Sequence, residues 1–155
     1  MAKGPTRKQK SASRLYAVQA LFQMEASKSD LTATLREFET HRFGAEVDGD
    51  TFEDGDQDLF REIVEGAVSH QAKIDQQTDE ALVNRWPIGR IDPTLRAVFR
   101  AAGGELNNAD TPGRVIITEY VELTRAFFPD GKEPGLVNGV LDHLIRDQFA
   151  DRLAT

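Results

Sequence analysis

The sequence of 155 residues contains no cysteine, and this absence excludes several classes of protein. Without cysteine the chain has no disulfide framework, no thiolate nucleophile and no cysteine-based zinc site. It also lacks a run of about 18 consecutive apolar residues, which a membrane-spanning helix would need. Residues 1–18 contain basic side chains but no apolar stretch of the kind found in a secretory signal. We therefore expect a cytoplasmic protein that does not enter a membrane.

Little in the sequence points to catalysis. The three histidines, His41, His70 and His143, lie far apart and have no metal-binding spacing such as HExxH. No G-x-S-x-G motif or phosphate-binding glycine loop is present. Gly103-Gly104 falls inside a helical pattern, where a glycine pair favours close packing of two helices. We expect no enzymatic activity, no metal and no cofactor.

One pair of carboxylates has a spacing that could serve catalysis. Glu119 and Glu122 lie three residues apart and would share one face of a helix, an arrangement found in acid–base and di-iron sites. A di-iron bundle needs Glu-x-x-His, and here the second position is glutamate with no histidine nearby. Arg114 and Arg125 are close in sequence, so we predict ion pairs with these acids.

The formal charge of −7 is distributed unevenly. The first fourteen residues carry five basic side chains and no acidic one, whereas the rest of the chain carries −12. We expect residues 1–13 to form a flexible basic arm and Arg14 to open the first helix. Such an arm is either a solvated tail or an element that binds anions, and composition leaves both alternatives open.

Apolar residues recur at helical spacing through most of the N-terminal half. Ser11 or Ser13 is a suitable N-cap for the first helix, and Asp30 precedes the second. A longer pattern after residue 58 predicts a helix that breaks near Lys73 into two and ends at Pro87.

The C-terminal half predicts three more helices. Asp92-Pro93 and Thr111-Pro112 each place a capping side chain before a proline, and a turn at residues 129–131 precedes the last helix. The helix after Thr111 is expected to bury Val115, Ile116, Tyr120, Leu123, Phe127 and Phe128. No segment alternates with period two for long enough to suggest a strand. The sequence thus predicts one all-α domain over residues 14–150 with about seven helices.

The segment from Gly44 to Asp58 contains seven acidic residues and no basic one. Its glycines and its like charges predict an exposed loop over about residues 44–57. An EF-hand beginning at Asp48 would need glycine at its sixth position and glutamate at its twelfth. The sequence has Glu53 and Leu59 there, so we do not expect a calcium site.

Four segments in a fixed order carry a family resemblance. They are R-L-Y-A-V-Q-A-L-F (Arg14–Phe22), L-R-A-V-F-R-A-A-G-G-E-L, T-P-G-R-V-I-I-T-E-Y-V-E-L-T-R-A-F-F and L-V-N-G-V-L-D, of which V-N-G-V-L-D (Val137–Asp142) is the most specific. Together they resemble the NusB family of transcription antitermination factors over about residues 7–149. The acidic stretch 44–57 looks like a variable insertion.

The resemblance implies a compact all-α fold with two packed helical bundles. It also implies a factor that binds boxA-like single-stranded RNA together with NusE, a small-subunit ribosomal protein. In the family this complex acts on RNA polymerase and promotes read-through in ribosomal RNA operons.

The resemblance also implies a set of contact residues. Those expected to bind RNA are Arg7, Lys8, Lys10, Arg14 and Lys132 through phosphates, and Phe22 and Phe128 through base stacking. Core packing is the alternative for both aromatics. Arg96 and Arg100 are expected on the partner-binding side.

The sequence departs from the family pattern before the last helix. Lys132-Glu133 stands where an Asp-Ser-type pair is frequent, and Leu136 replaces an aromatic residue. Loss of a stacked base would cost about 1–3 kcal/mol. We expect Asn138 to tie a loop to the helix and Gly139 to allow a neighbouring helix to approach closely.

Two other functions remain open from the sequence. A similar helical fold occurs as the N-terminal domain of a ribosomal RNA cytosine methyltransferase, so the chain could be a separate RNA-recognition subunit of that kind. It could also be a helical adaptor whose arm contacts nothing.

Overall fold

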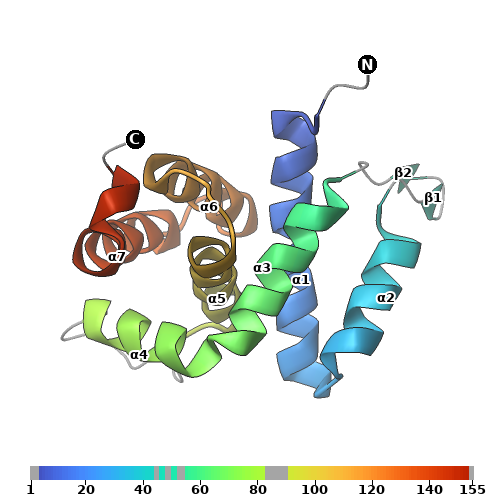
Figure 1. The fold of residues 1–155 in the computed structure, drawn as a ribbon, viewed down its shortest axis with the longest axis horizontal. Coiled ribbons are helices and arrows are strands. Elements are labelled where there is room, and N and C mark those ends of the chain that lie inside the picture. The colour runs from blue at the N-terminus through green and yellow to red at the C-terminus, as the bar shows by residue number, and fades with distance from the viewer. Residues whose placement is uncertain (1–3, 44–45, 48–49, 52–54, 83–90, 154–155) are drawn as a thin grey trace.

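The computed structural model describes residues 4–43, 46–47, 50–51, 55–82 and 91–153. These residues form seven α-helices, as the sequence predicted, with a short 3₁₀ segment and a pair of two-residue strands (Figure 1). In chain order the elements are α1 (Arg7–Ser27), α2 (Leu31–His41), β1 (Glu46–Val47), β2 (Asp50–Thr51), α3 (Gln57–Ser69), α4 (Gln71–Ala81), α5 (Pro93–Asn108), α6 (Gly113–Phe127), α7 (Glu133–Gln148) and η2 (Ala150–Leu153). The all-α class is confirmed.

The first helix begins earlier than its serines suggested. The Thr6 hydroxyl accepts from the Gln9 backbone N–H at 3.1 Å, and the Gln9 side chain accepts from the Thr6 N–H at 2.9 Å. This reciprocal capping box satisfies two N–H groups at the start of the helix. Residues 7–13, which we expected in a flexible arm, therefore form the first turns of α1. The prediction that Ser11 or Ser13 caps the helix was wrong.

Several other helix boundaries follow the predicted signals. Asp30 and Asp92 cap α2 and α5 by accepting from backbone N–H groups at 2.8 and 2.7 Å. The break between α3 and α4 lies at His70 and not near Lys73, because the His70 N–H bonds back to the Gly66 carbonyl and closes α3 there.

The start of α6 and the end of α4 differ from the prediction. Pro112 occupies the N-cap position of α6 and makes no side-chain cap. The Thr111 hydroxyl precedes this N-cap position and donates to the Glu105 carboxylate at 2.6 Å. The structure ends α4 at Ala81, and the predicted stop at Pro87 lies outside the described residues.

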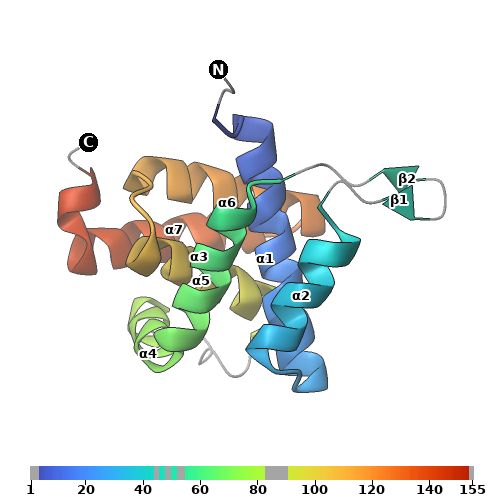
Figure 2. The ribbon, with the colours of Figure 1, turned by 45° about the vertical axis from the view of Figure 1, so that its right-hand side comes forward.

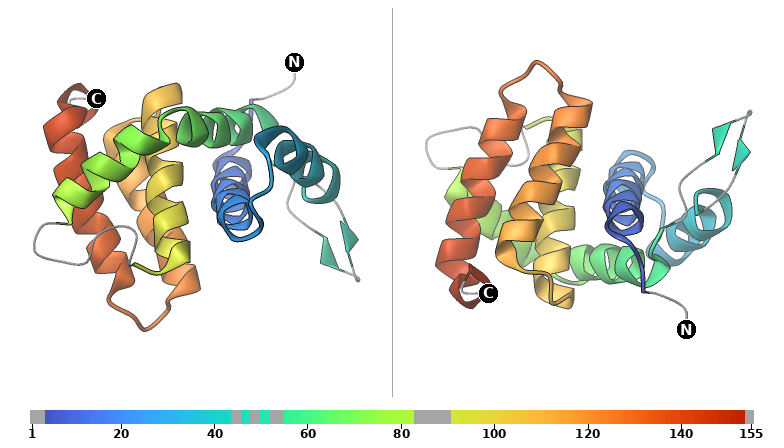
Figure 3. Two further views of the ribbon diagram at one scale, coloured as in Figure 1. Left: turned by 90° about the horizontal axis from the view of Figure 1, so that it is seen from below. Right: turned by 90° about the horizontal axis from the view of Figure 1, so that it is seen from above.

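Helix α5 lies at the centre of two bundles. The first bundle contains α1, α2 and α3, and the second contains α4, α5, α6 and α7 (Figures 1 and 3). The bundles join where α5 packs against α1 and α3, and a smaller contact joins α1 to α6. This α1–α6 contact places the basic end of α1 beside the second bundle.

Two glycines allow α3 and α5 to approach closely. A side chain on Gly104 would fall against the Ile63 carbonyl and within 2.6 Å of the Ala67 backbone nitrogen. A side chain on Gly66 would meet the backbone of Gly104 in return. The prediction that Gly103-Gly104 serves close helix packing is confirmed.

The acidic segment contains a small strand pair that the sequence did not predict. β1 and β2 pair antiparallel, with Glu46 opposite Thr51 and Val47 opposite Asp50. The pair stands apart from the helices (Figure 2). Because each strand has two residues, no alternation is visible in the sequence.

Candidate functional site

The first turns of α1 carry three of the expected RNA contacts. Arg7, Lys8 and Lys10 are all exposed, and the Arg7 side chain is 80% exposed. This end of α1 extends beyond the rest of the molecule toward the N-terminus (Figure 1). Because the Thr6 cap makes these turns helical, the three side chains have a fixed spacing.

Arg14 is buried and does not belong with these exposed residues. Its side chain is 3% exposed, and its Nε and Nη2 donate to the two Glu105 carboxylate oxygens at 2.9 and 2.8 Å. Burial acts to lower the pKa of Arg14, but the hydrogen bonds and charge of Glu105 outweigh it and raise that pKa. Arg14 is therefore a structural residue, and the expectation that it binds a phosphate is corrected.

Glu105 is the residue that sequence reasoning missed. It is fully buried and accepts from Arg14, from the Tyr120 hydroxyl at 2.9 Å and from Thr111. Burial, and then the negative charge of Glu105, raise the pKa of Tyr120 well above its ordinary value. The network links α1, α5 and α6 through hydrogen bonds to one carboxylate.

Glu119 on α6 holds the basic end of α1. Its oxygens accept from Ser11 Oγ, both at 3.1 Å, and one lies 3.3 Å from Arg14 Nη1 and 3.5 Å from Arg7 Nε. The predicted ion pairing is confirmed, although Glu119 pairs across helices and not with Arg114. The second acid, Glu122, pairs with Arg125 as predicted.

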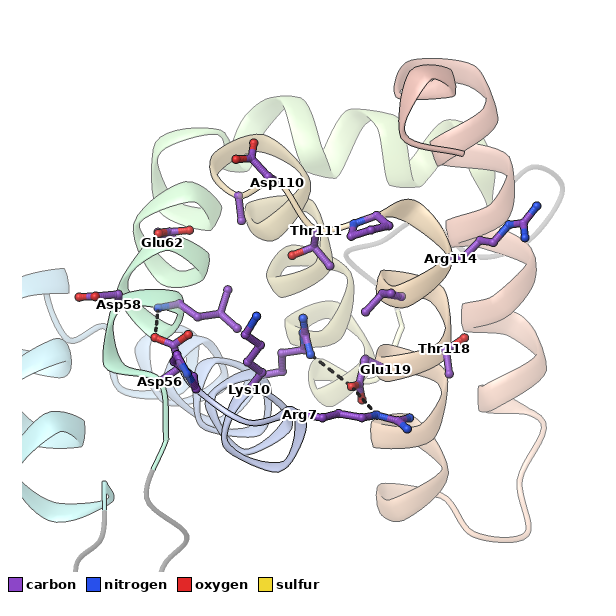
Figure 4. A pocket seen from close by; sticks show the side chains of 16 residues that line it. Arg7, Lys10, Asp56, Asp58, Glu62, Asp110, Thr111, Arg114, Thr118 and Glu119 are labelled. Carbon is purple, nitrogen blue, oxygen red and sulfur yellow. Dashed lines mark hydrogen bonds and ion pairs between the residues drawn. The ribbon is translucent and has the colours of Figure 1, made fainter. Parts of the chain in front are cut away.

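A cleft of about 850 Å³ lies beside this contact (Figure 4). Its walls come from α1, the start of α3, the connection between α5 and α6, and the first turns of α6. Its lining residues include Arg7, Lys10, Asp56, Asp58, Leu59, Glu62, Asp110, Pro112, Arg114, Val115 and Glu119.

The cleft is divided by charge. Asp56, Asp58, Glu62 and Asp110 lie on the α3 side, while Arg7, Lys10 and Arg114 lie toward α1 and α6 (Figure 4). Burial, followed by the charges of Asp56, Asp58 and Asp110, raises the pKa of Glu62. The acids are therefore close enough to repel one another, and a hydrogen-bond donor placed among them would relieve that repulsion.

A second groove lies at the C-terminal half of α1. Its volume is about 450 Å³, and Phe22, Phe127, Gln19 and Thr94 are among its lining residues. Phe22 is 41% exposed and Phe127 is 37% exposed. Phe22 thus presents a ring to solvent, as base stacking requires, whereas the prediction that Phe127 is buried was wrong.

Two residues near the α6–α7 turn, Phe128 and Lys132, complete the expected RNA set. Phe128 is half-buried against the core and Lys132 is exposed at the N-cap of α7. Leu136 is also half-buried and packs against the core. Val115, which we expected in the core, is 40% exposed and lines the charged cleft instead.

Arg96 and Arg100 are engaged within the chain. The Arg96 side chain is 11% exposed and pairs with Glu25 at 2.6 Å. The Arg100 side chain is 14% exposed and pairs with Asp75 at 2.9 Å. Both residues tie α5 to its neighbours α1 and α4.

The most specific sequence motif faces solvent in part. Asn138 and Gly139 are both exposed on α7. A side chain built on Gly139 would meet nothing within 4 Å, so the prediction that Gly139 lets another helix approach was wrong. Val137, Val140 and Leu141 of the same motif are buried.

Within the described ranges, no helix is long and apolar enough to cross a membrane. The same residues contain no group of three or more potential ligand side chains arranged to hold a metal ion.

The fold and site define a small all-helical protein in which a rigid basic helix end adjoins a cleft of mixed charge. The NusB family model matches residues 11–146, and the chain belongs to the NusB family. The transcription antitermination protein NusB of Agrobacterium fabrum is 48% identical over 139 residues, which cover 89% of this chain and 84% of that protein. The corresponding protein of Sinorhizobium fredii is 46% identical over 145 residues, covering 93% and 90%.

Solved structures show the same fold. NusB of T. maritima superposes with a TM-score of 0.74 at 24% identity, covering 94% of this chain and 96% of that one. A NusB chain crystallised with NusE and double-stranded RNA gives a TM-score of 0.69 at 20% identity, covering 92% and 99%. The two-bundle NusB fold is therefore confirmed.

Proposed function

We propose that this chain is a transcription antitermination factor that binds boxA-like single-stranded RNA together with NusE. It would join the antitermination complex of RNA polymerase and promote read-through in ribosomal RNA operons. Family membership supports this proposal, as does the likeness to a NusB chain crystallised with NusE and RNA. The structural observation that supports RNA binding most directly is the capped basic end of α1, which Glu119 holds in place.

The basic helix end supplies the phosphate contacts. Arg7, Lys8 and Lys10 neutralise backbone charge and release counterions, which makes binding sensitive to salt. Because their helix is formed before RNA arrives, no ordering of a tail is needed on binding. Phe22 and Phe128 offer faces for unpaired bases, and Lys132 offers a further phosphate contact.

The protein acts by binding alone, in the cytoplasm, without metal or cofactor. Arg96 and Arg100 support partner binding indirectly, by holding α1, α4 and α5 together. The methyltransferase-subunit alternative is not favoured, because relatives matched over 84% and 90% of their own length are antitermination proteins.

A triple replacement tests the helix end. Changing Arg7, Lys8 and Lys10 to alanine should weaken binding to boxA-like RNA strongly and reduce the slope of log K against log salt by about 2, as expected for three lost phosphate contacts. Fluorescence anisotropy over a salt series measures both quantities.

A control with the same loss of charge removes Arg36, Lys73 and Arg146, which lie elsewhere on α2, α4 and α7. This control should retain most of the affinity. Equal losses in the two triple variants would show that net charge, and not the helix end, determines binding.

A further inference from the structure

Two cations and three acids of the charged cleft do not pair with one another. In the described part of the chain, no ion pair or hydrogen bond joins Lys10 or Arg114 to Asp58, Glu62 or Asp110, although all five line one space (Figure 4). A cleft with opposite charges on its two sides fits a ligand that is itself dipolar. A nucleotide has this character, because its phosphate is anionic while its base can present N–H donors.

The size and apolar surface of the cleft also suit a nucleotide. A volume of about 850 Å³ lies within the range of about 300–1,000 Å³ typical of small-molecule sites. Val115 is 40% exposed, and with Leu59 and Pro112 it supplies apolar surface among the charges. An exposed valine in this position offers a contact for the face of a base.

The acids restrict which base would bind. An ionised carboxylate accepts hydrogen bonds and donates none, and its two oxygens accept best from two adjacent donors. Guanine presents N1–H and N2–H side by side on its Watson–Crick edge. Adenine and cytosine pair one amino donor with a ring acceptor, and uracil places one N–H between two acceptors.

We propose that this cleft receives a single unstacked guanine of the bound RNA, with Lys10 and Arg114 on its phosphates and the two oxygens of the Glu62 carboxylate on its N1–H and N2–H donors. This inference rests on the proposed RNA-binding function and adds base specificity to it. The cleft adjoins Arg7 and Lys10, so one strand can pass from the helix end into it. Among the described residues, which include the acids on the α3 side of the cleft, no group of three or more potential ligand side chains is arranged to hold a metal ion.

The test uses four 12-nucleotide oligouridylate RNAs that carry guanosine, inosine, adenosine or uridine at one central position. Inosine lacks the 2-amino donor and is otherwise close to guanosine. The full-length protein should bind the guanosine RNA about tenfold more tightly than the other three, which is within the usual discrimination of a bidentate contact. Anisotropy titrations at fixed salt measure the four affinities.

Glu62→Gln is the informative variant. Glu62 is exposed at the helix surface, so its replacement keeps the fold. The variant should bind the all-uridine RNA at least as tightly as the parent, because a repulsive charge is gone, while its preference for guanosine falls to about threefold or less. Glu80→Gln on α4 removes the same charge at an exposed position outside the cleft and should leave the preference unchanged.

The outcomes separate the inference from the function on which it rests. Equal binding of all four RNAs by the parent protein, or a full guanosine preference in Glu62→Gln, would overturn the guanine site and leave RNA binding intact. Unchanged RNA binding with weakened NusE binding in Glu62→Gln would assign the cleft to a basic protein segment and also overturn the inference. Failure to bind any RNA, boxA-like RNA included, would overturn both.

Discussion

Arg14 shows how one basic residue can differ from its neighbours. It is buried at 3% exposure and its charge is balanced by Glu105, which is fully buried. Lys8 and Lys10, within two turns of it, are exposed. Removing one member of a buried pair leaves an uncompensated charge in the core, whereas removing an exposed partner has little effect.

We therefore predict a large difference between two arginine replacements. Arg14→Ala should lower the free energy of unfolding by about 3–5 kcal/mol, because Glu105 loses its counter-charge. Arg125→Ala, which breaks the exposed pair with Glu122 on α6, should cost less than about 1 kcal/mol. Urea denaturation measures both values, and similar losses would contradict the structural role of Arg14.

We predict that Tyr120 makes the free energy of unfolding depend on pH in the alkaline range. Burial, and then the charge of Glu105, raise its pKa in the folded state, so the unfolded chain releases the phenolic proton first. The free energy of unfolding should therefore fall as pH rises above about 10, the ordinary tyrosine value. Tyr120→Phe should cost about 1–2 kcal/mol at pH 7 through the lost hydrogen bond, and should lose less stability than the parent between about pH 9 and 11. Identical losses in the two proteins would argue against this account.

Only one member of the buried Arg14–Glu105 pair could be predicted to be buried from the sequence. Arg14 precedes Ala17, Val18 and Leu21 by three, four and seven residues, so helical spacing alone places it on the buried stripe of α1. Because its neighbours in the sequence are basic, Arg14 was expected among the RNA-binding residues. The partner Glu105 is 91 residues away, and no local pattern indicates which buried charge balances another.

At the scale of elements, the helices were more predictable than their ends. Periodic apolar residues gave all seven, because burial of one face is what selects a helix. The start of α1 could have been found from Thr6 and Gln9, which have capping-box spacing. The start of α6 could not have been found in this way, because the Thr111 hydroxyl bonds to Glu105, a contact that only the tertiary structure shows.

We predict that replacing two helical glycines with alanine has opposite effects on stability. Gly104→Ala should destabilise the protein by about 1–3 kcal/mol, because the new methyl group meets the backbone of α3. Gly139→Ala should stabilise it by about 0.5–1 kcal/mol, since its position on α7 is open and alanine favours the helix. Thermal and urea unfolding measure both changes. Destabilisation by Gly139→Ala would show that a neighbour occupies that face.

At the scale of the whole molecule, charge is separated between one helix end and an acidic body. The net charge is −7, yet Arg7, Lys8 and Lys10 are all exposed in the first turns of α1. An acidic body repels RNA in general, so RNA contact is directed to the basic end of α1. Within the cleft, contact is directed to groups that donate hydrogen bonds to the carboxylates. Neither the cleft nor the Phe22–Phe127 groove was predictable, because each joins side chains from helices far apart in sequence.

The most direct test of the account is the affinity of the full-length protein for a short boxA-like single-stranded RNA, measured with and without NusE at low and high salt. We predict tighter binding than to a scrambled RNA of the same composition, a further increase when NusE is added, and a steep loss of affinity as salt rises. Equal affinity for the two RNAs under every condition, with no effect of NusE, would contradict the antitermination function while leaving the NusB fold in place.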